Sequence, residues 1–272
     1  MQKVFSITNR YIILTTPLIL YSLLSSVYIA ISTSNGKLIN LIMAFLLFTL
    51  MTGAFISGWL NMIKFAIVQP DREDVNSLIK EFPSGVGEYF LPVLGSLFVS
   101  FALSILIFLG MYYIGINLIG NLDVAPEALS KALQNTTELK VLLSSLSSEQ
   151  LMKINSWNML LLGGMTLIYY FIFLYFPSLF FKDKNPFIAF VISLKDLFSR
   201  KIFKTSGIFL LIFFLNFILS VLSVILGSNL IGHFFITLVN FYFITIVGVG
   251  VFYYYYNSFV LPIIGQNIDI EI

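Results

Sequence analysis

The sequence has no cysteine, a single histidine (His233) and few charged residues, which make up 10% of its 272 positions. Without cysteine there are no disulfides, thiolate metal sites or cysteine nucleophiles. One histidine excludes metal sites built from several histidines, and it excludes histidine proton relays. The small charged fraction argues against a water-soluble domain, because about a quarter of the residues in such domains are charged.

Further absences narrow the class of function. The formal net charge of +2 is too small to indicate nucleic acid as a partner. There is no Walker pattern and no dinucleotide-binding pattern, and we expect no cofactor. The central parts of the long apolar stretches contain no Asp, Glu, Lys or Arg, which proton relays and voltage sensors require. The sequence therefore predicts a protein that is not an enzyme.

Apolar residues dominate what is present: 58% of positions are hydrophobic and 17% are aromatic. A helix needs about 20 mostly apolar residues to cross the hydrocarbon core of a bilayer, which is about 30 Å thick. We therefore predict an all-α, polytopic membrane protein, a bundle of six transmembrane helices forming one integral membrane domain over residues 1–272. The predicted spans are residues 11–32, 38–63, 90–119, 157–181, 206–226 and 234–261.

Lysine and arginine are distributed unevenly over the connections between these spans. Positive residues are retained on the cytoplasmic side, so the richer set marks that side. With the N-terminus inside, the cytoplasmic set is Lys3, Arg10, Lys64, Arg72, Lys80, Lys182, Lys184, Lys195, Arg200, Lys201 and Lys204. The opposite side has Lys37, Lys131, Lys140 and Lys153. We expect a multi-pass protein of the plasma membrane with both termini in the cytoplasm.

Two connections on the predicted cytoplasmic side have the pattern of amphipathic surface helices. In the second of them, Asn185 is a suitable cap and Pro186 suits the first helical position. The apolar stripe that follows consists of Phe187, Phe190, Val191, Leu194, Leu197 and Phe198, and the residues off the stripe are Lys195, Asp196, Ser199 and Arg200. This spacing predicts a helix over residues 185–200 that lies parallel to the membrane, with its apolar stripe turned to lipid or to the bundle. We expect this helix to contact membrane lipids or a protein partner.

The first of these connections has a shorter pattern. Asp74 is a candidate cap, and the apolar residues Val75, Leu78, Ile79 and Phe82 form a short stripe. Pro83, Gly85 and Gly87 follow and are typical of an interruption. We therefore expect a short surface helix, separate from the span that begins at residue 90.

The connection over residues 120–156, on the predicted external side, is too long to be a plain turn. Pro126 is suited to open one short helix. Ser147 and Gln150 have the spacing of a capping box for another, and Glu149 and Lys153 have the spacing of an i, i+4 ion pair. The sequence thus predicts an external helical connection.

The end of the fourth span and the connection after it resemble a known group of proteins. The matching runs are Tyr175-Phe176-Pro177, Asn185-Pro186-Phe187-Ile188-Ala189, Ser193-Leu194 and Arg200-Lys201. Residues 157–226 resemble prokaryotic polytopic membrane proteins of unknown function related to the membrane-domain family of glycerophosphoryl diester phosphodiesterases. The resemblance implies a helical bundle with two intracellular surface helices in a prokaryotic membrane. It implies no catalysis, because a separate soluble domain is catalytic in those phosphodiesterases and this sequence contains no such domain.

A few polar and small residues within the spans are candidates for function. Asn216 and Asn240 lie well inside the fifth and sixth spans, where they either line a polar path or join neighbouring helices, and joining is the commoner role. Gly53, Ser57 and Gly58 indicate a close approach of two helices more than a hinge. Neither group identifies a ligand.

The sequence is therefore compatible with two functions. The first is a non-enzymatic accessory, regulatory or scaffold module of a membrane assembly, whose surface-helix residues Phe187, Phe190, Leu194, Lys195 and Arg200 contact lipid or a membrane or cytoplasmic protein. The alternative is a transporter or permease subunit for a small solute or lipid, with Asn216 and Asn240 lining the path.

Overall fold

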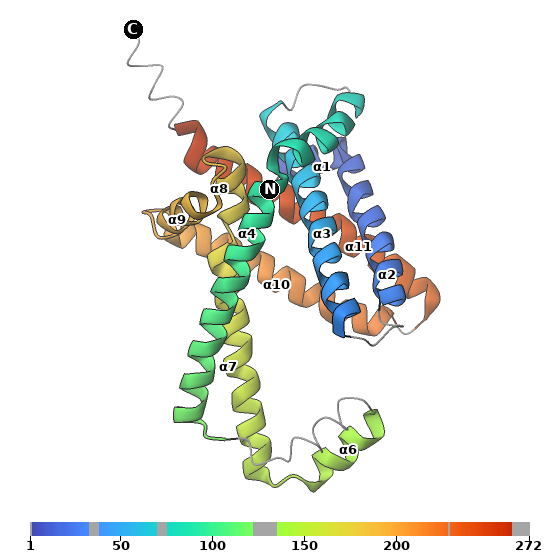
Figure 1. The fold of residues 1–272 in the computed structure, drawn as a ribbon, viewed down its shortest axis with the longest axis vertical. Coiled ribbons are helices and arrows are strands. Elements are labelled where there is room, and N and C mark those ends of the chain that lie inside the picture. The colour runs from blue at the N-terminus through green and yellow to red at the C-terminus, as the bar shows by residue number, and fades with distance from the viewer. Residues whose placement is uncertain (1, 33–37, 70–74, 122–134, 228, 263–272) are drawn as a thin grey trace. The chain divides into compact units, whose positions relative to one another are not determined.

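The computed structural model describes residues 2–32, 38–69, 75–121, 135–227 and 229–262, and the regular elements in these ranges are helices (Figure 1). Six of them are long and apolar enough to cross a membrane. They are Ile12–Ser32, Ile42–Val68, Val75–Leu118, Ser148–Phe181, Ile202–Leu226 and Leu230–Val260. The protein is an all-α polytopic bundle of six spans, and the prediction made from apolar length is confirmed.

The chain divides into two compact units, one from residues 1–99 and 171–272 and the other from residues 100–170. Two long helices, α4 (Val75–Leu118) and α7 (Ser148–Ile172), contribute to both. The other elements of the first unit are α1 (Gln2–Arg10), the 3-10 helix η1 (Ile12–Thr15), α2 (Thr16–Ser32), α3 (Leu38–Val68), α8 (Tyr175–Phe181), α9 (Pro186–Leu197), α10 (Ile202–Leu226), α11 (Leu230–Tyr255) and the π-helix η2 (Tyr256–Val260).

The core of the first unit lies at one end of its long helices, where α1, α8 and α9 pack against them. Its fully buried side chains include Leu14, Ile63, Tyr89, Tyr175 and Val249. The remaining lengths of α2, α3, α10 and α11 carry most of the exposed large apolar side chains of this unit. Apolar surfaces of this kind are suited to contact lipid in a membrane.

The first part of α4 corrects the prediction of a short surface helix followed by a separate span. The structure has one helix from Val75 to Leu118, with Pro83 and Pro92 inside it. This part packs along α3, where Gly58 faces the Phe82 ring and Gly85 faces Asn61. Packing along α3 holds the helix together although each proline removes a backbone hydrogen bond. The candidate cap Asp74 is outside the described residues.

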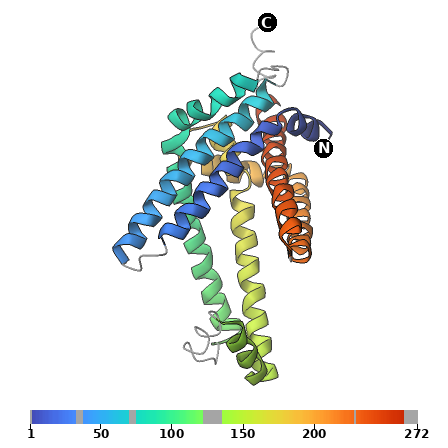
Figure 2. The same ribbon diagram turned by 90° about the vertical axis from the view of Figure 1, so that its right-hand side faces the viewer.

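The second unit contains an antiparallel pair formed by the later part of α4 and by α7, in green and yellow in Figure 2. Gly115 lies against the Trp157 ring, and the Trp157 indole donates to the Gly120 carbonyl at 3.1 Å. The helix α6 (Thr136–Ser145) is capped by Asn135, which accepts from the Thr137 N–H at 2.9 Å. This unit therefore holds the described part of the predicted helical connection.

The capping box in this connection is confirmed, but it opens a different helix from the one expected. The Gln150 N–H donates to Ser147 Oγ at 3.2 Å, and the Ser147 N–H donates to Gln150 Oε1 at 2.9 Å. Glu149 and Lys153 form the expected pair at 3.3 Å. These residues begin α7 itself, so the helix that the capping box opens is continuous with the fourth span. Pro126 is outside the described residues.

Candidate functional site

The hairpin of α8 and α9 is built by local capping. Asn185 Oδ1 accepts from the N–H groups of Phe187 and Ile188 at 3.0 and 3.3 Å, and Pro186 occupies the first turn of α9. The Tyr175 hydroxyl donates to the Pro186 carbonyl at 2.8 Å, which ties the start of α9 to α8. The predicted cap and helix start are confirmed.

The face of α9 that packs inward consists of small residues at its centre. Ala189 and Ser193 are buried, as is Leu197 near the end of the helix. Phe190 and Leu194 are partly buried, whereas Phe187, Val191 and Phe198 are 65%, 50% and 57% exposed. Lys195 and Arg200 are exposed as well. Small residues on this face allow α9 to approach the bundle closely. Most of the large side chains of the apolar stripe lie on the other sides of the helix, where they point away from the bundle or along its edge.

Asp196 joins three elements at the inner face of α9. Its carboxylate accepts from Lys182 Nζ at 2.8 and 3.1 Å and from the Tyr255 hydroxyl at 2.6 Å. Lys182 lies just after α8, and Tyr255 ends α11. The side chains of Lys182 and Asp196 are only 19% and 14% exposed. The ammonium also lies 5.4 Å from the centre of the Tyr255 ring, a cation–π distance.

A second group surrounds Tyr89 of α4, which is 1% exposed. Lys64 at the end of α3 donates to the Tyr89 hydroxyl at 2.7 Å, and the ring stacks on Phe180 of α8 with centres 4.2 Å apart. Lys184, in the α8–α9 connection, pairs with Glu88 at 2.8 Å and also lies 5.3 Å from the ring. Tyr89 is thus held between two lysines and one aromatic ring.

Two smaller contacts complete this end of the unit. Asn61 Nδ2 donates to the Glu81 carboxylate at 2.9 Å and to the Glu81 carbonyl at 3.0 Å, which joins α3 to α4. Lys201 Nζ donates to the Ser258 carbonyl, which lies in the π-helix η2. We use the name charged layer for Asn61, Lys64, Glu81, Glu88, Tyr89, Lys182, Lys184, Asp196, Lys201, Tyr255 and Ser258.

The chemistry of the charged layer is that of a structural network. Each of its three carboxylates is already bonded to an ammonium or an amide, and its lysines bond oxygens of other elements. Among the described residues, no three His, Cys, Asp or Glu side chains converge as metal ligands. The layer is therefore suited to fix α8, α9, α10 and α11 to one another and α4 to α3.

Sequence reasoning missed the role of Asp196. The sequence pattern puts Asp196 off the apolar stripe with Lys195 and Arg200, which are exposed, although the Asp196 side chain faces the bundle. Ala189, Ser193 and Asp196 recur at intervals of four and three residues, so they share one helical face. A helical face of small residues that ends in an acidic residue is the sequence pattern that could have predicted the inward position of Asp196.

The two asparagines are in different surroundings. Asn240 Nδ2 donates to Ser223 Oγ of α10 at 3.4 Å, and Asn240 is partly buried. Asn216 is exposed on α10. The structure therefore does not bring the two side chains together, and Asn240 makes a contact between two helices.

Replacing Asn240 with Leu is expected to lower the thermal stability in detergent only slightly. Hydrogen bonds between membrane helices are worth about 0.6 kcal/mol on average, and this one is long. Asn216→Leu is the matched control, and its effect on the melting temperature should be smaller still. A large loss of stability for Asn216→Leu would contradict the assignment of these roles.

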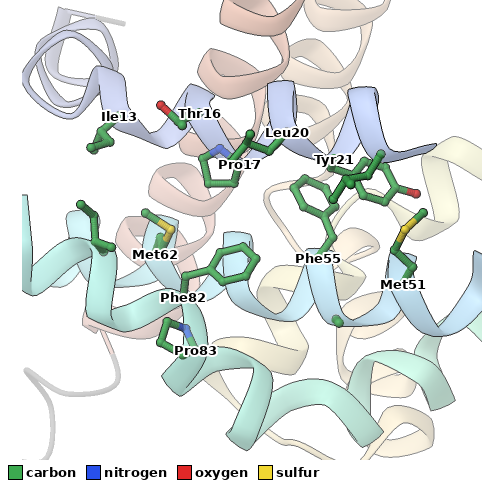
Figure 3. A pocket seen from close by; sticks show the side chains of 13 residues that line it. Ile13, Thr16, Pro17, Leu20, Tyr21, Met51, Phe55, Met62, Phe82 and Pro83 are labelled. Atoms are coloured by element: carbon green, nitrogen blue, oxygen red, sulfur yellow. The ribbon is translucent and has the colours of Figure 1, made fainter. Parts of the chain in front are cut away.

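An apolar pocket of about 520 Å³ lies between α2, α3 and the first part of α4 (Figure 3). The stacked rings of Tyr21 and Phe55 line it, with centres 4.2 Å apart, and so do Phe82 and Pro83. The Tyr21 hydroxyl is bonded to Thr52 at 2.6 Å, so the pocket offers few polar partners. Its volume is in the usual range for small-molecule sites, and its lining suits an acyl chain better than a polar solute.

No family model, curated protein or solved structure matches the chain. The resemblance of residues 157–226 to the phosphodiesterase membrane-domain family stays a prediction. The described features that bear on function are the charged layer, the exposed face of α9 and the apolar pocket between α2, α3 and α4.

Proposed function

We propose that the protein is a non-enzymatic scaffold, an accessory or regulatory module of a membrane assembly, in which α9 is a rigidly mounted contact element. The observation that carries this proposal is the bonding of Asp196 to Lys182 and Tyr255. Holding an amphipathic helix by a nearly buried ion pair costs desolvation, and we propose that this pair fixes the position of α9 more than it stabilises the fold. A helix fixed in this way presents the same outer face at all times.

The proposed orientation places the charged layer on the cytoplasmic side of a prokaryotic plasma membrane. Among the described residues of the first unit, all lysines and arginines lie at the end that contains α1, α8 and α9. They are Lys3, Arg10, Lys64, Lys80, Lys182, Lys184, Lys195, Arg200, Lys201 and Lys204. The acids described in this unit are fewer: Glu81, Glu88, Asp183 and Asp196. The positive excess supports a cytoplasmic location for this end and for both termini.

The outer face of α9, together with the turn that follows it, combines apolar and basic side chains. Phe187, Val191 and Phe198 are at least half exposed, and Lys195 and Arg200 are exposed beside them. Such a face fits the membrane surface, with rings among the headgroups and cations toward anionic lipid, or the apolar patch of a partner protein. Its fixed position favours a contact role over a moving gate.

Because the chain contains no cysteine, single-cysteine variants give a clean test. We expect Val191→Cys, carrying a maleimide–benzophenone probe, to crosslink one defined membrane or cytoplasmic protein in native membranes. Adding Arg200→Glu should remove that product. Lys195→Cys should react with an impermeant maleimide in inverted vesicles but not in intact cells, which checks the orientation.

The matched control is Phe214→Cys, at a position of α10 that is 60% exposed on an apolar span and should yield lipid adducts alone. The same protein crosslinked from both positions would contradict a specific contact at α9. Uptake of a solute into proteoliposomes, abolished by Asn240→Leu, would overturn the scaffold proposal and support the transporter.

A further inference from the structure

The apolar pocket between α2, α3 and the first part of α4 is elongated along the two spans (Figure 3). On α2 it is lined by Pro17, Tyr21 and Leu24, whose spacing of four and three residues places them on one face of the helix. On α3 the lining extends from Met51 to Met62, eleven residues further along, which is about 16 Å at about 1.5 Å per residue. This length is close to half of the hydrocarbon core, which is about 30 Å thick. The pocket therefore has the depth of one leaflet.

The pocket opens onto the apolar surface of the spans. Leu20 and Leu24 of α2 and Ile79 of α4 belong to its lining and are 56%, 60% and 46% exposed. Met62 is only 2% exposed and Phe55 is partly buried, so the other part of the lining lies inside the unit. An opening at the side of membrane-spanning helices meets lipid chains, which are apolar as this lining is.

The lining offers almost no hydrogen bonds to a ligand. Its described residues include no charged side chain, and its side-chain hydroxyls are those of Tyr21 and of Thr16, which lies at the start of α2. Thr52 donates to the Phe48 carbonyl at 2.7 Å, so the Tyr21 hydroxyl is the donor in its 2.6 Å bond to Thr52. A buried water needs about two to four polar partners, and a quinone would leave its carbonyl oxygens without donors here. The interior of the pocket therefore matches hydrocarbon.

The walls of the pocket are held apart by aromatic packing. Tyr21 stacks on Phe55 with ring centres 4.2 Å apart, and Phe55 stacks on Trp59 at 5.7 Å. The Phe82 ring lies against Gly58, where an added Cβ would be 2.8 Å from it. Protein interiors keep few empty spaces larger than a water molecule, because the atoms that line a void lose their dispersion contacts. A pocket of about 520 Å³ with walls fixed in this way is stabilised by a chain that fills it.

We infer that this pocket binds one acyl chain of a phospholipid, which lies along α2 and α3 with its headgroup at the membrane surface. The Met62 end of the pocket is two residues from Lys64, so the lipid belongs to the leaflet on the side of the charged layer. A free fatty acid is disfavoured, because no charged residue in the described lining pairs with its carboxylate. The inference goes beyond the scaffold proposal and does not depend on α9. A bound chain would join the first part of α4 to α2 and α3.

Trp59 is a natural reporter for this chain. The sequence has two tryptophans, and Trp157→Phe, a change in the second unit, leaves Trp59 as the single one. The Trp59 side chain is 8% exposed and stacks on Phe55 of the pocket wall, so it is shielded from most of the surrounding lipid. Bromine atoms on a lipid chain quench tryptophan emission only at short range. In liposomes of dioleoyl phosphatidylcholine with brominated chains, we expect most of the Trp59 emission to be lost relative to liposomes of the unbrominated lipid.

Two variants of this single-tryptophan protein fill the pocket from opposite walls. Ala54→Leu adds carbon atoms from α3, and Leu24→Phe adds them from α2 at a position that is 60% exposed and therefore tolerates a larger side chain. Both should remove most of the quenching by the brominated lipid while the melting temperature stays nearly unaltered. The matched control is Ala102→Leu, the same substitution at an exposed position of α4 in the second unit, which should leave the quenching unchanged.

Three results would overturn the inference. Unchanged quenching in both pocket variants would mean that Trp59 senses the surrounding lipid and not a chain in the pocket. Equal emission in brominated and unbrominated liposomes, with the pocket unaltered, would mean that no chain enters it. Brominated stearic acid, added to unbrominated liposomes, should quench Trp59 less than brominated phospholipid does at the same mole fraction. Stronger quenching by the acid would assign the pocket to a free fatty acid and refute the phospholipid assignment.

Discussion

Asp196→Ala should lower the melting temperature in detergent by roughly 6–12 °C. The change leaves the Lys182 ammonium, which is 19% exposed, without its carboxylate, and it removes the acceptor of the Tyr255 hydroxyl. Breaking a buried pair by removing one partner costs about 3–5 kcal/mol, and the remaining exposure places this pair near 3 kcal/mol. In chains of 150–250 residues each kcal/mol shifts the melting temperature by about 2–4 °C.

Two controls distinguish the effect of the lost ion pair from a general effect of substitutions in α9. Lys195→Ala changes the neighbouring exposed residue of α9 and should leave the melting temperature nearly unaltered. Lys182→Met combined with Asp196→Leu removes both charges, and it should recover much of the lost stability because no lone charge is left buried. If this double variant is no more stable than Asp196→Ala, the unpaired Lys182 charge is not the cause of the lost stability. Asp196→Ala should also reduce the α9 crosslink, because the helix loses its fixed position.

Gly85→Ala and Gly87→Ala are expected to have opposite effects, although the two glycines are two residues apart in α4. A Cβ at Gly85 would meet the Asn61 side chain and the Ser57 carbonyl of α3, whereas a Cβ at Gly87 would meet nothing within 4 Å. Overpacking of this kind costs about 1–3 kcal/mol. At Gly87 the better helix propensity of alanine should add up to about 1 kcal/mol.

The comparison is made on purified protein by thermal unfolding followed by loss of helical circular dichroism. Gly85→Ala should melt several degrees below the unaltered protein, and Gly87→Ala should melt at the same temperature or slightly above it. Equal melting temperatures for the two variants would mean that α4 does not pack closely on α3 at Gly85. That result would also mean that packing on α3 does not account for the continuity of α4 across Pro83 and Pro92.

The sequence predicted the features that depend on composition and local chemistry. The six spans follow from apolar length, because a bilayer admits only helices or closed barrels of sufficient length. The Asn185 cap, the Pro186 helix start and the Ser147–Gln150 box follow from side chains that bond their own backbone neighbours. These contacts are encoded within a few residues, so no knowledge of the tertiary fold is needed to recognise them.

Contacts between segments that are far apart in the sequence could not be predicted from local patterns. Lys64 and Tyr89 are 25 residues apart, and Asp196 and Tyr255 are 59 apart, so no local pattern relates the members of each pair. A pocket lined by Lys3 and Arg10 of α1 and by Tyr253 of α11 joins residues from the two ends of the chain. From the sequence alone, Lys3 and Arg10 indicate the orientation in the membrane and nothing about their neighbours.

The sequence by itself determined that this is a helical membrane protein with six spans, because the solvent of a lipid bilayer imposes length and apolarity on each span separately. Tertiary structure alone decided that Val75 to Leu118 is one helix, since the packing of Gly85 and Phe82 on α3 outweighs the prolines. It also decided that Asp196 faces the bundle and not the water. The reason in both cases is that close packing and charge pairing depend on which segments meet, and this is a property of the whole fold.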